Sequence, residues 1–347
     1  MKLSRGLNIG GYLSQCPHEE THYDRFFAEA DIRRIRGWGF DHIRLPFDYN
    51  ILEDESGRPR PEGFARLWRI CEWCRIYELN LILDLHKAFG YDFNDAGNAA
   101  KNNLFANEEN CRRFVTLWER VAMAFGSYPH VAFELLNEVV EEENAEGWNA
   151  LIRRAVTTIR EIAKETPIIY GGIRWNSADA LALLETPITD NILFTFHFYE
   201  PLLFTHQKAY WVENIVKDRD ISYPDTMEKY RADSEPMGMK GLPLCQAAAK
   251  TMGPEFIQEM MSDAFAVAKS TGIGLYCGEF GVIDQAPLPD TVRWYDDVVR
   301  ILRDNGIGYA VWTYKEKDFG ILDAHYDEIR EELLEILTGD KMREDDK

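Results

Sequence analysis

The sequence predicts an α/β fold of the (β/α)8 TIM-barrel type, because short apolar runs alternate with longer amphipathic runs along the whole chain. Eight such cycles can be counted, the number that a closed barrel of this type requires. No Gly-rich phosphate loop follows a predicted strand, as would be expected of a doubly wound sheet. The chain has 347 residues, 46% of them apolar, so we expect a single barrel domain over residues 1–347.

Each predicted strand is a short run with an apolar interior, as expected for strands that are buried on both faces. In chain order these strands are Leu3–Ile9, Asp41–Pro46, Leu81–His86, Val131–Asn137, Ile168–Gly172, Ile192–Tyr199, Gly274–Glu279 and Tyr309–Thr313. Runs with a 3.6-residue period lie between them, and glycine or proline follows several of these runs, where a helix should end. The clearest predicted helices are Tyr23–Trp38, Phe64–Tyr77, Glu108–Phe125, Trp148–Lys164, Phe256–Ser270 and Thr291–Asp304.

One connection is much longer than the others. Residues 201–253 separate the sixth strand from the next helix, whereas loops in α/β units are usually about 2–6 residues long. We expect a small helical insert in this loop, forming a subdomain over the carboxyl-terminal face of the barrel, which is the catalytic face in this fold. Its aromatic residues, including Tyr210 and Trp211, leave two roles open, shaping a cleft or purely structural packing.

The composition argues against several classes of protein. The net charge of −20 would repel a polyphosphate, so no nucleic-acid partner is expected. Six cysteines are too few for a disulfide scaffold and indicate buried free thiols. No run of roughly 18 or more apolar residues is present and the N-terminus lacks the apolar core of a signal peptide, so no membrane partner is expected. We predict a soluble monomer, cytoplasmic as written, or secreted if a signal peptide has been removed.

Polar and aromatic side chains gather where the predicted strands end, which is where the active site of a (β/α)8 barrel lies. A single arginine or histidine at such a place could be a satisfied core residue. Burying several charges without water or a ligand would cost several kcal/mol per ion, so a solvated binding pocket explains the whole set better. The residues of this set are Arg44, His86, Asn137, Glu138, His197, Tyr199, Glu279 and Trp312.

Two glutamates in this set, Glu138 and Glu279, supply the pair of carboxyl groups that glycoside hydrolysis requires. Strands four and seven lie nearly opposite one another in an eight-stranded barrel, so the two side chains can face each other across a sugar-sized gap. Arg44 is expected to keep Glu279 ionised as the nucleophile. Glu138, further from positive charge and beside an apolar wall, is expected to be the acid/base.

The neighbouring side chains suggest supporting roles. His197 could position the acid/base or relay its proton, and Tyr199 could donate a hydrogen bond to the nucleophile. Asn137 is placed to bind a sugar hydroxyl, and Trp312 offers a flat face on which a pyranose ring can stack. No cofactor and no metal ion are needed for this chemistry, and none is expected.

Seven short motifs carry a resemblance to a known family. GLNIGGY, HIRLPFDY, LDLH, ELLNEV, HFYEP, YCGEFGV and AVWTYK occur in this order over nearly the whole chain. They resemble glycoside hydrolase family 5, a family of retaining (β/α)8 enzymes that includes many cellulases. The segment FTHQKAYW and the long insert behind it are similar to those of the compact, single-domain clostridial endoglucanases of this family.

The resemblance implies a retaining endo-β-1,4-glucanase acting on cellulose, a mixed-linkage β-glucan or their oligosaccharides. It implies that Glu138 is the acid/base and Glu279 the nucleophile, and that the other six residues of the set bind or support the substrate. Family members also cleave mannan, glucomannan or β-1,3-glucan, so these polymers remain alternatives. The sequence departs from the family's common pattern at KAFG after His86, at Thr313, and at Arg174 and Trp175, which bears on the sugars that fit.

Two rival functions come from other classes. A metal-dependent hydrolase could use His86, His197, Glu138 and Glu279 as ligands, but no HxH or HExxH spacing is present and Arg44 would oppose a cation. A non-catalytic carbohydrate-binding protein could keep the cleft and its aromatic residues. Such proteins usually lose one of the two carboxylates, and this chain has both.

Overall fold

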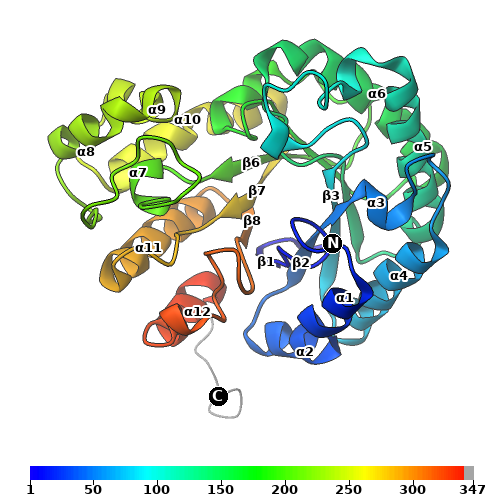
Figure 1. Ribbon diagram of the computed structural model, residues 1–347, viewed down its shortest axis with the longest axis horizontal. Helices are drawn as coiled ribbons and strands as arrows, with labels where there is room; N and C mark the ends of the chain where they lie inside the picture. The colour runs from blue at the N-terminus through cyan, green and yellow to red at the C-terminus, as the bar shows by residue number, and fades with distance from the viewer. Residues whose placement is uncertain (340–347) are drawn as a thin grey trace.

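The computed structural model describes residues 1–339 and is a closed barrel of eight parallel strands that follow one another in chain order (Figure 1). The predicted (β/α)8 fold is confirmed. Residues 340–347, which the predicted domain includes, lie outside the described residues. The strands are β1 (Arg5–Asn8), β2 (His42–Asp48), β3 (Asn80–Lys87), β4 (Val131–Glu134), β5 (Ile168–Gly171), β6 (Ile192–Phe198), β7 (Gly274–Phe280) and β8 (Gly308–Val311).

Helices surround the barrel (Figure 1). They are α1 (Glu20–Phe26), α2 (Glu29–Gly37), α3 (Tyr49–Leu52), α4 (Pro61–Ile76), α5 (Glu108–Phe125), α6 (Ala145–Ile162), α7 (Leu202–Thr205), α8 (Met227–Ser234), α9 (Leu242–Gln246), α10 (Pro254–Thr271), α11 (Leu288–Asp304) and α12 (Arg330–Thr338). Short 3-10 helices are η1 (Phe93–Asp95), η2 (Leu104–Ala106), η3 (Glu142–Asn144), η4 (Ala178–Leu183), η5 (Glu235–Lys240) and η6 (Ala324–Tyr326). The predicted helix Glu108–Phe125 matches α5 at both ends.

The predicted helix Tyr23–Trp38 is wrong as a single helix, because the chain forms α1 and α2 with a break between them. Phe27 and Ala28 are extended at the break. The ring of Phe27 is buried with its centroid 5.4 Å from that of Tyr12, and the Asp31 carboxylate accepts a hydrogen bond from the backbone N of Ala28 at 2.8 Å. Packing of Phe27 and the cap on α2 therefore outweigh the continuous helical periodicity.

The helical insert after strand six is confirmed: α7, α8, η5 and α9 lie between β6 and α10. The backbone N of Tyr223 donates to Asp290 of α11 at 3.0 Å, and its hydroxyl donates to Asp297 at 2.9 Å. Ala248 N donates to Glu259 of α10 at 2.6 Å. Figure 1 shows α7, α8 and α9 at the left of the molecule, next to α10. The insert is therefore anchored on the two outer helices that follow it.

The interior of the barrel has a small apolar layer of its own, separate from the larger core between strands and helices. This layer consists of Ile82, Ala132, Ile169, Tyr276 and Ala310, all of them buried. Alternate residues of a strand point to the same side, so Asp84 and Glu134, two positions further along their strands, also point into the barrel. The interior thus changes from apolar to charged toward the carboxyl ends of the strands.

A register shift between β6 and β7 determines where Glu279 points. Phe196 pairs with Cys277, but the next residue of β6, His197, pairs with Glu279, so Gly278 is passed over. An irregularity of this kind re-aims the side chains that follow it. It brings Glu279 level with His197 on the inside of the barrel, where strict alternation would have turned it outward.

The cysteines of the described residues are all free, and four of them, Cys71, Cys74, Cys111 and Cys277, are buried as expected. Cys16 and Cys245 are only partly buried. Among residues 1–339, none of the helices combines the length and the apolar character that crossing a bilayer would require.

Candidate active site

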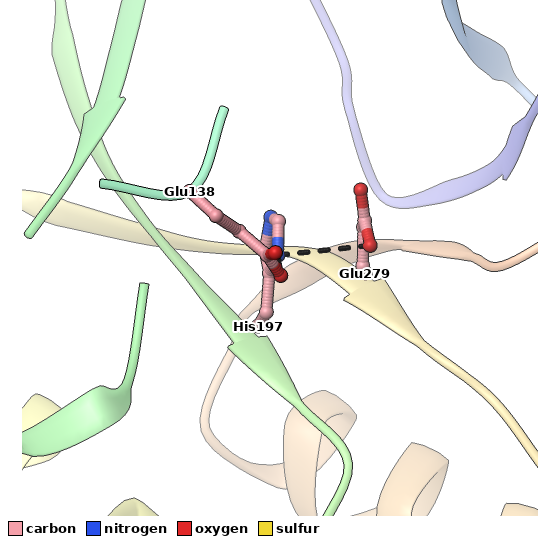
Figure 2. Close-up of side chains that lie close together, drawn as sticks. All are labelled: Glu138, His197 and Glu279. Carbon is pink, nitrogen blue, oxygen red and sulfur yellow. Dashed lines mark hydrogen bonds and ion pairs between the residues drawn. The ribbon is translucent and has the colours of Figure 1, made fainter. Parts of the chain in front are cut away.

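Glu138, His197 and Glu279 lie together at the carboxyl end of the barrel (Figure 2). Nδ1 of His197 is 2.7 Å from Oε1 of Glu138 and 3.7 Å from Oε2 of Glu279. An oxygen of one glutamate lies within 4.8 Å of an oxygen of the other. The side chain of Glu138 is 12% exposed and that of Glu279 is 7% exposed. The two carboxyl groups are therefore close together and largely buried.

Arg44 contacts three carboxylates from inside the barrel. Its Nη1 donates to Oε1 of Glu279 at 2.7 Å. Its Nε and Nη2 donate to the two oxygens of Glu134 at 2.7 and 3.0 Å, a bidentate pair of fixed geometry. Nη2 also lies 3.0 Å from Oδ2 of Asp84. The guanidinium is thus locked in place and presents one donor to Glu279.

Tyr199 and two asparagines complete this network. The Tyr199 hydroxyl donates to Oε2 of Glu279 at 3.0 Å, so each oxygen of this carboxylate accepts one hydrogen bond. The side-chain oxygens of Asn8 and Asn137 accept from Arg44 at 3.0 and 2.9 Å. Since the oxygen of Asn137 is committed to Arg44, its NH2 group is the part that can bind a hydroxyl.

The carboxylates around Arg44 outnumber its single positive charge. Burial raises the pKa of Asp84 to about 7, and Arg44 opposes this shift. Burial also raises the pKa of Glu134. The carboxylates of Asp84, Glu134 and Glu279 in turn keep the pKa of Arg44 well above its ordinary value, although burial alone would lower it. Protonation of Asp84 would reduce the excess negative charge, and its Oδ1 has no hydrogen-bond partner among the described residues.

Arg44 was expected at the end of strand two, and that placement is wrong. It is the third residue of β2, which continues through Pro46 to Asp48. The predicted strand ended at Pro46, but Pro46 pairs with Asp84 of β3 and the pairing continues to Asp48. The long side chain of Arg44 reaches the carboxyl end from inside the strand.

His86 and Trp312 form one wall of the site. Nδ1 of His86 is 2.7 Å from Oδ2 of Asp84, and its Nε2 is 3.1 Å from the amide nitrogen of Gln15. Burial lowers the pKa of His86 to about 4, so the ring is neutral at neutral pH. The indole of Trp312 lies parallel to this ring at 5.9 Å and is 7% exposed. Both rings are therefore fixed before a substrate binds.

Burial shifts the pKa values of Glu138 and His197, in opposite directions. Burial raises the pKa of Glu138 to about 7, although His86 and Arg44 oppose this shift. Burial lowers the pKa of His197 to about 4. At neutral pH a substantial part of Glu138 is therefore protonated next to a neutral imidazole.

The residue types of this cluster could also hold a metal ion, since Glu138, His197 and Glu279 each offer a ligand atom within 4.8 Å of the others. Both oxygens of Glu279 are already hydrogen-bonded, one of them to the guanidinium of Arg44 at 2.7 Å. A cation would meet this fixed positive charge. Because both oxygens of Glu279 already accept hydrogen bonds from protein donors, the cluster is a poor site for a resident metal ion.

Comparison with known proteins identifies the family. The model of the cellulase family, glycosyl hydrolase family 5, matches residues 8–318. The chain belongs to glycoside hydrolase family 5. The resemblance predicted from the seven motifs is thereby confirmed.

Several relatives of this family 5 chain match most of its length. Endoglucanase C of Acetivibrio thermocellus is 37% identical over 97% of this chain and 98% of its own length. Cellodextrinase A of Ruminococcus flavefaciens is 36% identical over 87% of this chain and 83% of its own length. The structure of Thermotoga maritima Cel5A in complex with cellobiose aligns with a TM-score of 0.75 and 26% identity, covering 96% of this chain and 97% of that one.

The structure shows where several residues that depart from the common family 5 pattern lie. Lys87, in the KAFG segment, forms an ion pair with Asp92 at 2.6 Å. Thr313 accepts a hydrogen bond from Gly10 N and donates one to Asn8 O, both at 2.9 Å, and so joins the segment after β8 to the end of β1. Trp175 is 45% exposed, and Trp211 of the insert is 39% exposed. Neither tryptophan is a core residue.

All eight predicted site residues lie at this end of the barrel, but the prediction missed five residues whose side chains form hydrogen bonds or ion pairs with the side chains of this set. Asp84 could have been found, because it is two residues before His86 in a strand and so shares its face. Glu134 is the last residue of β4, and its role depends on Arg44 in another strand. Asn8 is the last residue of β1, next to the predicted strand end at Ile9, whereas Gln15 and Asn176 lie in loops between the predicted strands. The five are Asn8, Gln15, Asp84, Glu134 and Asn176.

Proposed function

We propose that this protein is a retaining endo-β-1,4-glucanase that hydrolyses cellulose or mixed-linkage β-glucan by double displacement. The observation that carries the proposal is the separation of the two carboxyl groups. One oxygen of Glu138 lies within 4.8 Å of one oxygen of Glu279, which fits the roughly 5–5.5 Å between the carboxyl groups of retaining enzymes better than the roughly 6.5–9.5 Å of inverting ones. Family 5 membership and full-length similarity to an endoglucanase support it.

In the first displacement Glu279 is the nucleophile. Its carboxylate attacks the anomeric carbon, and the hydrogen bonds from Arg44 and Tyr199 fix its direction of attack. Glu138, which the raised pKa keeps partly protonated, gives its proton to the leaving glycosidic oxygen. The carbon–oxygen bond breaks as the bond to Glu279 forms, which leaves a glycosyl ester on the enzyme.

In the second displacement Glu138 acts as the base. Having lost its proton, it takes one from a water molecule that attacks the anomeric carbon, and the ester to Glu279 breaks. His197, 2.7 Å from Glu138, supports this carboxyl group in both steps. Two inversions at the same carbon give net retention of the β configuration.

Three further residues bind the sugar next to the broken bond. Asn137 offers its NH2 group, since its oxygen accepts from Arg44. Trp312 and His86 supply the wall of parallel rings. We also propose that the start of the 201–253 insert forms one side of the cleft, because the ring of His206 lies 5.0 Å from that of Tyr199.

The proposal leaves a second candidate for the polysaccharide substrate. Thermotoga maritima Cel5A has also been solved in complex with mannotriose, so a β-mannanase or glucomannanase on the same site is the second candidate. Glucose and mannose differ only at C2, next to the carbon that reacts. Hydrogen bonds at that hydroxyl therefore decide between the two substrates.

The proposal is tested by hydrolysis of carboxymethylcellulose, barley β-glucan, lichenan, glucomannan and laminarin, with Glu138→Gln and Glu279→Gln as controls and one arm after exhaustive chelation. We expect release of reducing sugar from β-1,4-linked glucans, its loss in both variants, and full activity after chelation. Cleavage of glucomannan alone would move the substrate to the second candidate. Tight oligosaccharide binding without turnover would instead indicate a carbohydrate-binding protein, and loss of activity on chelation a metal-dependent hydrolase.

A further inference from the structure

The loop after β5 has an unusual backbone. Arg174, Trp175 and Asn176 have φ angles of 52°, 55° and 55°. Residues other than glycine rarely adopt this left-handed conformation, and three of them in succession are rarer than a single one. Backbone strain of this kind persists only where the surrounding structure fixes it, and it clusters at functional sites.

Two backbone hydrogen bonds connect this loop to the segment that carries Glu138 and to His197. The N of Trp175 donates to the carbonyl oxygen of Val139, the residue directly after Glu138, at 3.0 Å. The N of His197 donates to the carbonyl oxygen of Asn176 at 2.9 Å. The left-handed turn therefore joins the segment that carries Glu138 to the strand that carries His197.

The same turn directs the side chain of Asn176 inward. Asn176 is 1% exposed, and its Nδ2 lies 3.4 Å from Nε2 of His197. Gly171 leaves the room for this amide, since a Cβ there would overlap Oδ1 of Asn176. On the other side, a Cβ at Gly278 would lie 3.1 Å from Nε2 of His197. The Asn176 amide thus lies next to Nε2 inside a closely packed wall, which also contains the buried hydroxyl of Thr195.

We propose that Asn176 is a positioning residue for the acid/base: its amide donates to Nε2 of His197 and so places the ring hydrogen on Nδ1, facing Glu138. A neutral imidazole carries one hydrogen, and the partner of one nitrogen determines which nitrogen bears it. The low pKa of His197, caused by burial, keeps the ring neutral at neutral pH. This inference rests on the proposed role of Glu138 and adds a residue to it.

The position of this hydrogen decides where the acidic proton of Glu138 lies. If Nδ1–H donates to Oε1, at 2.7 Å, the proton of the carboxyl group is on Oε2 and free to pass to the leaving oxygen. If the ring hydrogen were on Nε2, Nδ1 would instead accept the proton of Glu138 and withdraw it from the substrate. Asn176 therefore favours the form of the pair that protonates the leaving group.

The first test measures the tautomer of His197 without any turnover. Two-bond proton–nitrogen NMR correlations of protein labelled with ¹⁵N-histidine distinguish the two ring nitrogens, and the His197→Gln variant assigns the signal. We expect the hydrogen on Nδ1 in the wild type and a shift toward Nε2 in Asn176→Asp, which keeps the side-chain shape but cannot donate. A wild-type hydrogen on Nε2, or the same tautomer in both proteins, would overturn the inference.

The second test measures kcat/KM for aryl β-cellobiosides with poor and good leaving groups. General acid catalysis contributes roughly 10²–10⁴-fold, and a good leaving group such as 2,4-dinitrophenolate needs no proton. We expect Asn176→Ala to lower kcat/KM by about tenfold or more with a poor leaving group and by less than about threefold with 2,4-dinitrophenolate. An equal loss with both substrates would contradict acid positioning.

Asn149→Ala is the matched control, because Asn149 is a buried asparagine whose amide donates only to backbone oxygens of Ala145 and Leu183. It should lose stability without changing the dependence on the leaving group; a changed dependence would contradict a specific role of Asn176. If the wild type cleaves no cellobioside, the proposed function fails, while the NMR measurement still decides the role of Asn176.

Discussion

At the residue scale, the site depends on how Arg44 is neutralised. Its guanidinium is fully buried and touches carboxylates from three strands, β3, β4 and β7. Only Glu279 among these faces the neighbouring Glu138 across the gap. Asp84 and Glu134 therefore fix the donor that Arg44 presents to Glu279, the proposed nucleophile.

Glu134→Ala tests this arrangement. Removing Glu134 leaves the buried Nε of Arg44 without a partner, so we expect the free energy of unfolding to fall by roughly 1–3 kcal/mol in urea titrations. The control is Glu109→Ala, which breaks an ion pair with Arg112 at the surface of α5 and should cost less than about 1 kcal/mol. Similar small losses in both variants would contradict a structural role for Glu134.

The pH dependence of activity follows from the pKa of Glu138, which burial raises to about 7. The first displacement needs this group protonated, and the protonated fraction falls as pH rises through the pKa. We therefore expect kcat/KM on cello-oligosaccharides to decline above about pH 7, approaching tenfold per pH unit. With a 2,4-dinitrophenyl cellobioside this decline should be absent. A constant kcat/KM up to pH 9 on cello-oligosaccharides would contradict the assignment.

Site residues at the ends of strands can be predicted from the sequence. The residues that hold their side chains in place, such as Asn176, cannot. Glu138 and Glu279 stand beside strand ends, where the barrel topology brings polar groups together. Asn176 follows the fifth strand within a turn of three left-handed residues, a conformation that the letters RWN do not predict. Its role depends on His197, which is 21 residues further along the chain.

At the element scale, all eight strands could be predicted because each is a compact apolar run between turn signals. Their ends could not be predicted as well. β4 ends at Glu134, whereas the predicted strand continued to Asn137. Asn137 and Glu138 are therefore in a loop, which lets two successive residues face the site. The break between α1 and α2 was missed because it depends on packing of Phe27 against a ring from another part of the chain.

The insert supplies a chain of aromatic rings that leads away from the site. The ring of His206 lies 5.0 Å from Tyr199 and 6.1 Å from Trp211. If this part of the insert lines the cleft, Trp211→Ala should lower kcat/KM on short cello-oligosaccharides by roughly 2- to 10-fold, the worth of one aromatic contact. Met239→Ala is the control, since Met239 is an 82% exposed apolar residue of the same insert. Equal rates for both variants would mark the insert as structural packing alone.

At the scale of the whole molecule, barrel closure makes the site. Glu138 and Glu279 are 141 positions apart in the sequence, yet the closed ring of strands brings their oxygens within 4.8 Å. Arg44 and His197 reach the same space from two further strands. The sequence could predict this convergence, because eight β/α cycles fix the topology and the topology fixes which strand ends meet. The separation of the carboxyl groups needed coordinates.

The central claim is that Glu279 forms a covalent bond with the sugar. The most direct measurement is mass spectrometry of peptides after incubation with 2,4-dinitrophenyl 2-deoxy-2-fluoro-β-cellobioside, whose fluorine slows the second displacement and preserves the glycosyl ester. The account predicts one 2-fluorocellobiosyl group, located on the peptide that contains Glu279, and no label in Glu279→Gln. Hydrolysis of cellobiosides without any adduct, or a label on Glu138 instead, would contradict it.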